Sequence, residues 1–418
     1  MTTTEFATAD IRWRNLLLWI IGGGLLFPLF FQLSGRIYNS VDPVWDSGGL
    51  ISQLPLPVSL LVCCCGMLLL ASNYRQATLA LRVVAAMALL MVLSLVLAGS
   101  EIEFRKIILL IQILLPMAGL VLGQLVKDNN KIIPKAFLGV LLLIVPAQLV
   151  TGWVQNNFSL THNMYVFSIY QHFQYVPLIL VCGFAYSMSM LWDTYKTIFY
   201  FLTPLMYIYA LESLSFLTIL ALVVFVCTFA FVRLKGLKKM QVIILVGVAI
   251  IGMQAYLAII KNVVGMGGST EWQYVGKFNT LEHGEPPRNV RDRLGDWKLY
   301  GEGIVESTKT VFIGHPAPFP REVKTSAHNW YLDMAYNFGI ISLLPVIFLS
   351  SYTVYLLWQR RKTLTAVIFW LTAIVIYLVI FDSNFKVTLR QPYPGIFTYF
   401  MWGMLLSSLK RAHLESDC

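Results

Sequence analysis

Charged residues are scarce in this chain of 418 residues, where aspartate, glutamate, lysine and arginine make up 12% of the sequence. An average soluble domain contains about 25%. A soluble protein of this length folds as roughly two or three domains and needs far more polar surface. Hydrophobic residues account for 57% of the chain. This composition argues against a soluble enzyme or nucleic-acid-binding protein and favours a membrane protein.

Disulfide and metal-binding cysteine patterns are also missing. Buried cysteines most often act as small hydrophobic residues. We expect no cleaved signal peptide, because the first apolar run, 15–33, is long and lacks a small-x-small cleavage site. Five of the six cysteines lie inside apolar runs and the sixth ends the chain: Cys63, Cys64, Cys65, Cys182, Cys227 and Cys418.

Apolar runs of about 16–23 residues recur along the chain, the length at which a helix crosses a bilayer core of roughly 30 Å. Helices are expected because lipid offers no water to backbone groups, and an alternating β-barrel pattern is missing. The sequence therefore predicts an all-α polytopic membrane protein. Twelve spans are expected: 15–33, 50–72, 80–98, 107–126, 136–154, 176–192, 197–212, 216–232, 240–260, 336–358, 365–381 and 394–409.

The basic residues, which give a net charge of +10, fall mostly in short loops, where they set membrane orientation. Five lie on one side: Arg36, Arg105, Lys106, Lys386 and Arg390. Seventeen lie on the other: Arg12, Arg14, Arg75, Arg82, Lys127, Lys131, Lys135, Lys196, Arg233, Lys235, Lys238, Lys239, Arg360, Arg361, Lys362, Lys410 and Arg411. The second side is expected to be cytoplasmic, and both termini with it.

One long loop, 261–335, falls on the outer side between two blocks of spans, 1–260 and 336–418. A loop of this length is usually functional or disordered. Its many aromatic and aliphatic residues can bury apolar surface, which argues against disorder. Leu294, Trp297, Ile304 and Val305 recur at nearly helical spacing and predict a helix over 289–307.

Three arginines lie close together in this loop, at Arg288, Arg291 and Arg293. Guanidinium groups pair two oxygens at once, so the cluster suits a di-anion such as a lipid pyrophosphate. The simpler interpretation is that the arginines pair with neighbouring carboxylates such as Asp292 and Asp296, or contact anionic head groups.

His328 lies just before the tenth expected span, followed by Asn329 and Trp330. A neutral imidazole there could take a proton from a sugar hydroxyl. The simpler interpretation is an interfacial histidine bonded to backbone. Metal binding is disfavoured, because the remaining outer histidines lack ligand spacing. These are His162, His172, His283 and His315.

Taken in order, the outer-loop motifs resemble those of the O-antigen ligase and polymerase superfamily. An Arg-x-x-x-Trp helix start corresponds to Arg293 and Trp297, and a Phe-x-x-Gly-like segment to 311–315. A His-Asn-x-x-Leu motif that leads to a glycine corresponds to 328–339. The residue-level match covers about 45 residues, while the topology matches over the whole chain.

One feature departs from that family. Many members carry a Ser-Arg pair near the outer end of the seventh or eighth span, where this chain reads Glu212-Ser213-Leu214-Ser215. Another outer cation, such as Arg36, Arg105 or Arg390, could supply the missing charge, or the pyrophosphate could be bound differently.

The resemblance implies a GT-C-type glycosyltransferase in the bacterial inner membrane, with its active site on the periplasmic face. The donor is a glycan on undecaprenyl pyrophosphate, and the acceptor is a sugar hydroxyl of lipid A-core, as in lipopolysaccharide biosynthesis. His328 is the expected catalytic base, and substrate contacts are expected from Arg288, Arg291, Arg293, Trp297 and Asn329. We expect no cofactor, metal or nucleic acid.

Three alternatives remain open. An O-antigen polymerase has the same chemistry with a growing glycan as acceptor. A protein O-oligosaccharyltransferase usually has an additional soluble region after its last span, whereas only nine residues follow Leu409 here. A transporter or flippase would carry ionisable residues at mid-membrane and repeat symmetry, which are not evident in these spans.

Overall fold

The structure is a computed structural model that describes residues 3–31, 56–99, 103–128, 130–155, 172–213, 215–233, 240, 288–320, 323 and 326–414. These residues are almost entirely helical, as expected. The exception is an antiparallel pair of two-residue strands, which joins Phe30 to Pro57 and Phe31 to Leu56. The described residues therefore form a polytopic helical array.

The elements are α1 (Thr3–Leu26), β1 (Phe30–Phe31), β2 (Leu56–Pro57), α2 (Val58–Leu69), η1 (Ala71–Ala77), α3 (Thr78–Ala98), α4 (Phe104–Leu114), η2 (Leu115–Met117), α5 (Ala118–Leu125), α6 (Ile132–Gln155), α7 (His172–Glu212), α8 (Phe216–Arg233), α11 (Arg288–Ile304), α12 (Thr308–Ile313), α13 (Trp330–Phe338), η3 (Ile340–Leu343), α14 (Leu344–Gln359), α15 (Ala366–Ile376), η4 (Tyr377–Asp382), α16 (Ser383–Phe385), η5 (Thr388–Arg390) and α17 (Pro392–Leu414). Four of the η elements are short 3₁₀ helices, and η4 is a π-helix.

Seven helical stretches among the described residues are long and apolar enough to cross a membrane. They are Ala71–Ala98, Phe104–Leu125, Ile132–Thr151, Tyr175–Leu211, Phe216–Arg233, Ile340–Gln359 and Ala366–Phe385. Each overlaps one or two of the spans predicted from the sequence. Apart from Met240, the predicted span 240–260 and the first part of the long loop, 261–287, lie outside the described residues.

Helix α7 contains both the sixth and the seventh predicted spans. A straight helix of its 41 residues would be roughly 60 Å long, about twice the bilayer core. The backbone leaves the helical conformation at Tyr195, and the rings of Phe184 and Phe199, on either side of this break, lie 6.1 Å apart. The chain therefore reverses at Tyr195, and α7 consists of two adjacent antiparallel segments.

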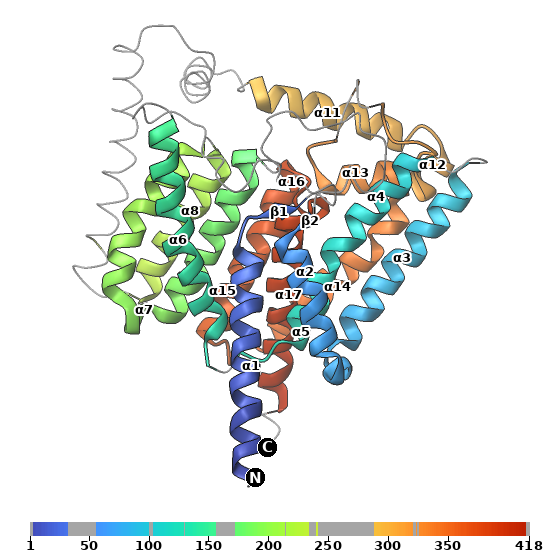
Figure 1. Cartoon of the computed structure of the whole chain (residues 1–418). Coiled ribbons are helices and arrows are strands. Elements are labelled where there is room, and N and C mark those ends of the chain that lie inside the picture. Colours follow the sequence, from blue (N-terminus) through green and yellow to red (C-terminus); the bar gives the residue numbers. More distant parts are fainter. Residues whose placement is uncertain are drawn as a thin grey trace, which may run out of the picture.

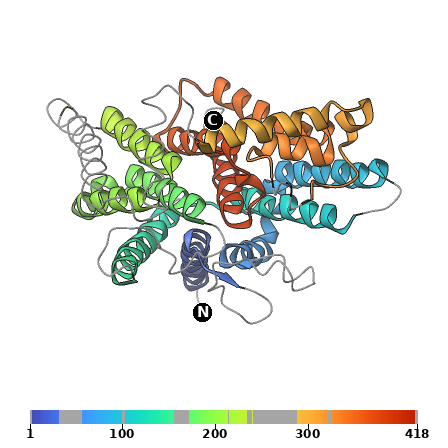
Figure 2. The same cartoon turned by 90° about the horizontal axis from the view of Figure 1, so that it is seen from above.

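Helix α17 lies near the middle of the array when it is seen from above (Figure 2). It is buried along most of its length, and α5 lies directly against it. A Cβ atom at Gly123 of α5 would lie 2.2 Å from the carbonyl oxygen of Phe400. Only glycine permits this approach, as is common where membrane helices cross closely.

Helices α11, α12 and α13 lie across one end of the array, opposite the N-terminal end of α1 and the C-terminal end of α17 (Figure 1). Two side chains from the spanning helices hold this layer: Ser94 of α3 donates to the carbonyl of Ile313, and Lys106 of α4 donates to that of His315. Gly339 ends α13 with φ +76° and lies against the backbone of Phe312. The same end of the array also contains the candidate site.

A π-helix interrupts the last part of the α15 span. The π turn runs over Tyr377–Asp382, and Ser383 donates to the carbonyl of Leu378, five residues earlier. Such turns occur frequently at functional sites, because the extra residue changes the direction of the side chains that follow. This turn leads directly to Asp382 and Lys386, both fully buried.

Candidate functional site

His328 lies in the short connection that enters α13, with a backbone φ of +50°. This left-handed conformation is uncommon for residues other than glycine, although histidine adopts it more often than most. The backbone N–H of His328 lies 3.4 Å from the Ser326 hydroxyl oxygen, its hydrogen-bond acceptor. The imidazole is 46% exposed, so a substrate can reach it.

The His328 ring contacts a carboxylate that is distant in sequence. Its Nδ1 atom lies 3.2 Å from Oδ2 of Asp296 in α11. The Asp296 side chain is only 4% exposed, whereas the ring is accessible. The structure thus presents an exposed imidazole backed by a buried carboxylate.

Asn329 fixes the start of α13. Its side-chain oxygen accepts hydrogen bonds from the backbone N–H groups of Tyr331 and Leu332, at 2.9 and 3.2 Å. This is the preferred arrangement at a helix N-cap. Its side-chain nitrogen donates to the side chain of Asn384 in α16, at 3.3 Å. In this structure Asn329 therefore joins the His328 connection to two helices, and its predicted contact with substrate stays a prediction.

Arg293 lies one turn before Asp296 on α11 and is partly buried. It makes no hydrogen bond or ion pair with any residue that the structure describes. Burial lowers the pKa of its guanidinium, and electrostatic interactions with Tyr175 and Asp382 act in the opposite direction. Arg293 and Asp296 do not form an ion pair, so the guanidinium donors are unpaired within the described part of the chain.

Trp297 follows Arg293 by four residues, so the two side chains lie on the same face of α11. Its ring centroid is 5.9 Å from that of Phe385. The indole Nε1–H is buried and has no hydrogen-bond partner within the described part of the chain. An unpaired buried donor is costly, and a bound acceptor group would satisfy it. Arg293 and Trp297 thus have donors on one face of α11 that no described residue accepts.

The other two predicted arginines are placed differently. Arg291 is exposed. It lies two residues before Arg293, and because an α-helix has 3.6 residues per turn, the two side chains lie on opposite sides of α11. Arg288 begins α11, and its side chain lies outside what the structure describes. The structure therefore gathers His328, Asn329, Arg293 and Trp297 around α11 and α13, and places Arg291 away from them.

Lys386 and Asp382 form a fully buried ion pair beside this site, with Nζ and Oδ1 3.1 Å apart. Asp382 also accepts a hydrogen bond from Thr388. The Lys386 ammonium lies 5.3 Å from the ring centroid of Tyr175. Burial lowers the pKa of Lys386, and the charge of Asp382 opposes this shift.

Arg390 is one of the outer-side cations considered in the sequence analysis as a second positive charge. Its Nη1 lies 2.6 Å from Oδ2 of Asp333 in α13, and both side chains are buried. Its Nε–H has no hydrogen-bond partner among the described residues. Arg390 therefore has a carboxylate partner, whereas Arg293 has none among the residues that the structure describes.

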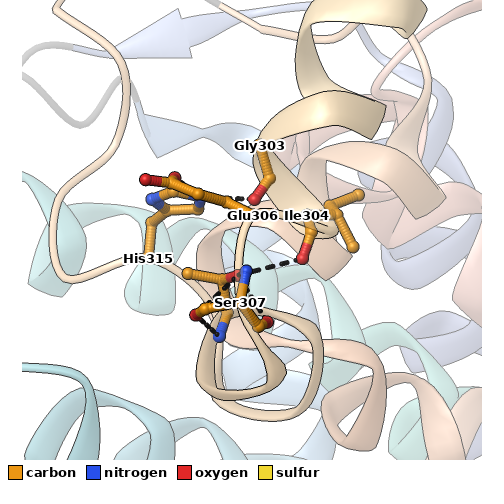
Figure 3. Close-up of polar contacts among 6 residues, drawn as sticks. Gly303, Ile304, Glu306, Ser307 and His315 are labelled. Carbon is orange, nitrogen blue, oxygen red and sulfur yellow. Dashed lines mark hydrogen bonds and ion pairs between the residues drawn. The ribbon is translucent and has the colours of Figure 1, made fainter.

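His315 makes polar contacts with the end of α11 in the layer formed by α11, α12 and α13 (Figure 3). Its Nε2 lies 2.8 Å from the carbonyl oxygen of Gly303 and 3.7 Å from Glu306. Its ring stacks on Tyr336 at a centroid distance of 4.1 Å. Because a carbonyl can only accept, Nε2 carries the proton. These contacts assign His315 to the packing of α11 against α13.

Metal ligands do not gather among the described residues, where no group of three or more His, Cys, Asp or Glu side chains could hold a metal ion. His162 and His283 lie outside the described residues. Metal independence therefore stays a prediction.

Sequence reasoning missed the contact of Asp296 with His328 and the buried ion pairs of Asp333 and Asp382. The sequence analysis considered Asp296 only as an ion-pair partner of the arginines, because it lies close to them in the sequence. The usable signal was the i, i+3 spacing from Arg293, which puts Asp296 near the face occupied by Arg293 and Trp297. Comparison with models of known families and with curated proteins finds no match to this chain.

Proposed function

We propose that this protein is a glycosyltransferase that moves a glycan from undecaprenyl pyrophosphate to a sugar hydroxyl of lipid A-core, as an O-antigen ligase does. The observation that carries the proposal is the Arg293 guanidinium, partly buried and without a carboxylate partner among the described residues. It lies one helical turn from the carboxylate that contacts His328. An anion site and a proton acceptor therefore adjoin each other.

The proposed chemistry needs these two groups. His328 accepts the proton of the acceptor hydroxyl, whose oxygen attacks the anomeric carbon of the donor sugar. The bond from that carbon to the pyrophosphate oxygen breaks, and its electron pair leaves with the pyrophosphate. Arg293 binds the leaving group and stabilises its growing negative charge. The lipid pyrophosphate already activates the sugar, so neither a nucleotide nor a metal enters the proposal.

The proposal includes a place in the cell. The site lies in the layer that crosses one end of the helices, opposite the ends of α1 and α17 (Figure 1). We propose twelve spans of a GT-C-type fold in the bacterial inner membrane, with α11–α13 in the periplasm and both termini in the cytoplasm. Two lipid-borne substrates could then reach His328 from the outer leaflet.

The surface polysaccharide of a deletion strain tests this function. Loss of a ligase leaves long chains on undecaprenyl pyrophosphate and none on lipid A-core. Loss of a polymerase instead leaves single repeat units on the core. Complementation with His328→Gln should fail, because glutamine cannot accept a proton near neutral pH. Normal lipopolysaccharide in the deletion strain would exclude both activities.

A further inference from the structure

We infer that Asp296 is a positioning residue that sets which ring nitrogen of His328 accepts the proton, an inference that rests on the function proposed above. The contact behind it joins Nδ1 of His328 to Oδ2 of Asp296 at 3.2 Å. The two residues are 32 positions apart, so only the folded layer brings them together.

The tautomer follows from this contact. An ionised carboxylate can only accept hydrogen bonds, so Nδ1 of His328 must carry a proton. In the neutral ring the proton-accepting lone pair is then on Nε2. The carboxylate is 4% exposed and the ring 46% exposed. Asp296 therefore contacts the His328 ring from the buried side, while Nε2, the proton-accepting nitrogen, belongs to the exposed imidazole.

Both partners are held rigidly. Asp296 lies on α11, whose Tyr300 and Ile304 are buried in a cluster with Ala335 and Tyr336 of α13. His328 precedes the Asn329 cap of that same α13. Its φ of +50° is an unusual conformation, and such conformations persist where the surroundings impose them and are frequent at active sites.

The carboxylate also stabilises the product of proton transfer. When the acceptor hydroxyl gives its proton to Nε2, the ring becomes an imidazolium beside the negative charge of Asp296. The acceptor oxygen bonds to the anomeric carbon, and the pyrophosphate leaves with the electrons of the broken carbon–oxygen bond. The ring later releases its proton to the departing phosphate or to water, which restores the starting state.

The same contact explains why Arg293 has no ion pair with Asp296. The carboxylate faces His328, while Arg293, three residues earlier, stays within electrostatic range of it. One side chain thus orients the base without neutralising the anion site. An ion pair between Arg293 and Asp296 would remove both functions at once.

The test compares Asp296→Asn with wild type in membrane nanodiscs that contain an undecaprenyl-pyrophosphate glycan and lipid A-core. Asparagine keeps the size of the side chain, but its amide can bind either ring tautomer. We expect kcat to fall about 10²-fold or more, with the KM for the donor lipid and the melting temperature unchanged.

Asp296→Glu should recover part of kcat. Asp292→Asn, an exposed carboxylate on the same helix, is the matched control and should behave as wild type.

A double variant separates positioning from a structural role. If Asp296 acts through His328, Asp296→Asn combined with His328→Gln should be no slower than His328→Gln alone. A full kcat in Asp296→Asn, an additive double variant, or a raised donor KM with a lowered melting temperature would each overturn the inference. The single variants His328→Gln and Arg293→Ala, assayed in parallel with the Asp296 variants, test the proposed function itself. If both retained full turnover, that function would fail whatever Asp296 does.

Discussion

Arg390 and Asp333 form a buried ion pair across two segments that are far apart in sequence, with Nη1 and Oδ2 2.6 Å apart. Arg390 ends η5, just before the central helix α17, and Asp333 lies in the first turn of α13. Since α13 begins two residues after His328, this pair connects the centre of the array to the helix that directly follows the candidate base.

Removing one partner of this pair should destabilise the protein. Arg390→Met leaves the Asp333 carboxylate buried without its cation, a change that typically costs about 3–5 kcal/mol. We expect a lower melting temperature in detergent, and Arg390→Met combined with Asp333→Leu should recover much of it. Arg361→Met is the control, because Arg361 is exposed. An unchanged melting temperature in the single variant would show that the pair contributes little.

Arg293 should be the most sensitive of the three arginines. Arg293→Ala removes a guanidinium that no described residue pairs with, and transfer should fall by about 10²–10³-fold, as when a donor to a developing oxyanion is lost. Arg293→Lys should recover little, because the planar pair of donors is missing. Arg291→Ala should cost less, and exposed Lys298→Ala serves as the control. Transfer assays with the purified variants compare their rates. Equal losses in Arg291→Ala and Arg293→Ala would contradict the placement of Arg293 at the site and Arg291 away from it.

Trp297 should contribute a hydrogen bond to the bound donor. Trp297→Phe keeps a ring beside Phe385 but removes the buried Nε1–H, which is unsatisfied within the described part of the chain. The KM for the donor lipid should rise about 2- to 10-fold, the value of one hydrogen bond. Trp358→Phe, at an exposed position of α14, should leave KM unchanged. A Trp297→Phe enzyme with wild-type KM would show that the donor does not reach the indole.

Transfer should not depend on a divalent cation. The described residues contain no group of three or more potential ligands, and the proposed leaving group is stabilised by arginine. Activity of the purified protein should persist in excess EDTA. Loss of activity that added Mg²⁺ or Mn²⁺ restores would require a metal site elsewhere in the chain.

The orientation can be measured at exposed described positions. Glu302→Cys lies in α11, and Lys362→Cys lies in the connection between α14 and α15. On spheroplasts, a membrane-impermeant maleimide should label position 302 and leave position 362 unlabelled until the cells are broken. Labelling of the parent protein, without either substitution, measures the background from the native cysteines. The reverse labelling pattern would place the proposed site in the cytoplasm.

Local sequence features predicted much of what lies near the site. The near-helical spacing over 289–307 predicted a helix, and α11 runs over Arg288–Ile304. The buried face was only partly anticipated: Trp297 and Ile304 turn inward, while Leu294 and Val305 are 50% and 70% exposed. Periodicity reveals a helix, but contacts with α13 decide which of its apolar residues are covered.

By itself, the sequence determined that this chain is a polytopic helical protein, because low charge and long apolar runs are properties of composition and length. It also singled out His328, Arg293 and Trp297, which share the layer over the helix ends. Only the tertiary structure decided that Asp296 contacts His328, that Arg390 pairs with Asp333, and that Arg291 faces away from Arg293. Hydrogen bonds and ion pairs act over a few ångströms, so residues distant in sequence meet only where the packing of α11, α13 and the segment before α17 brings them together.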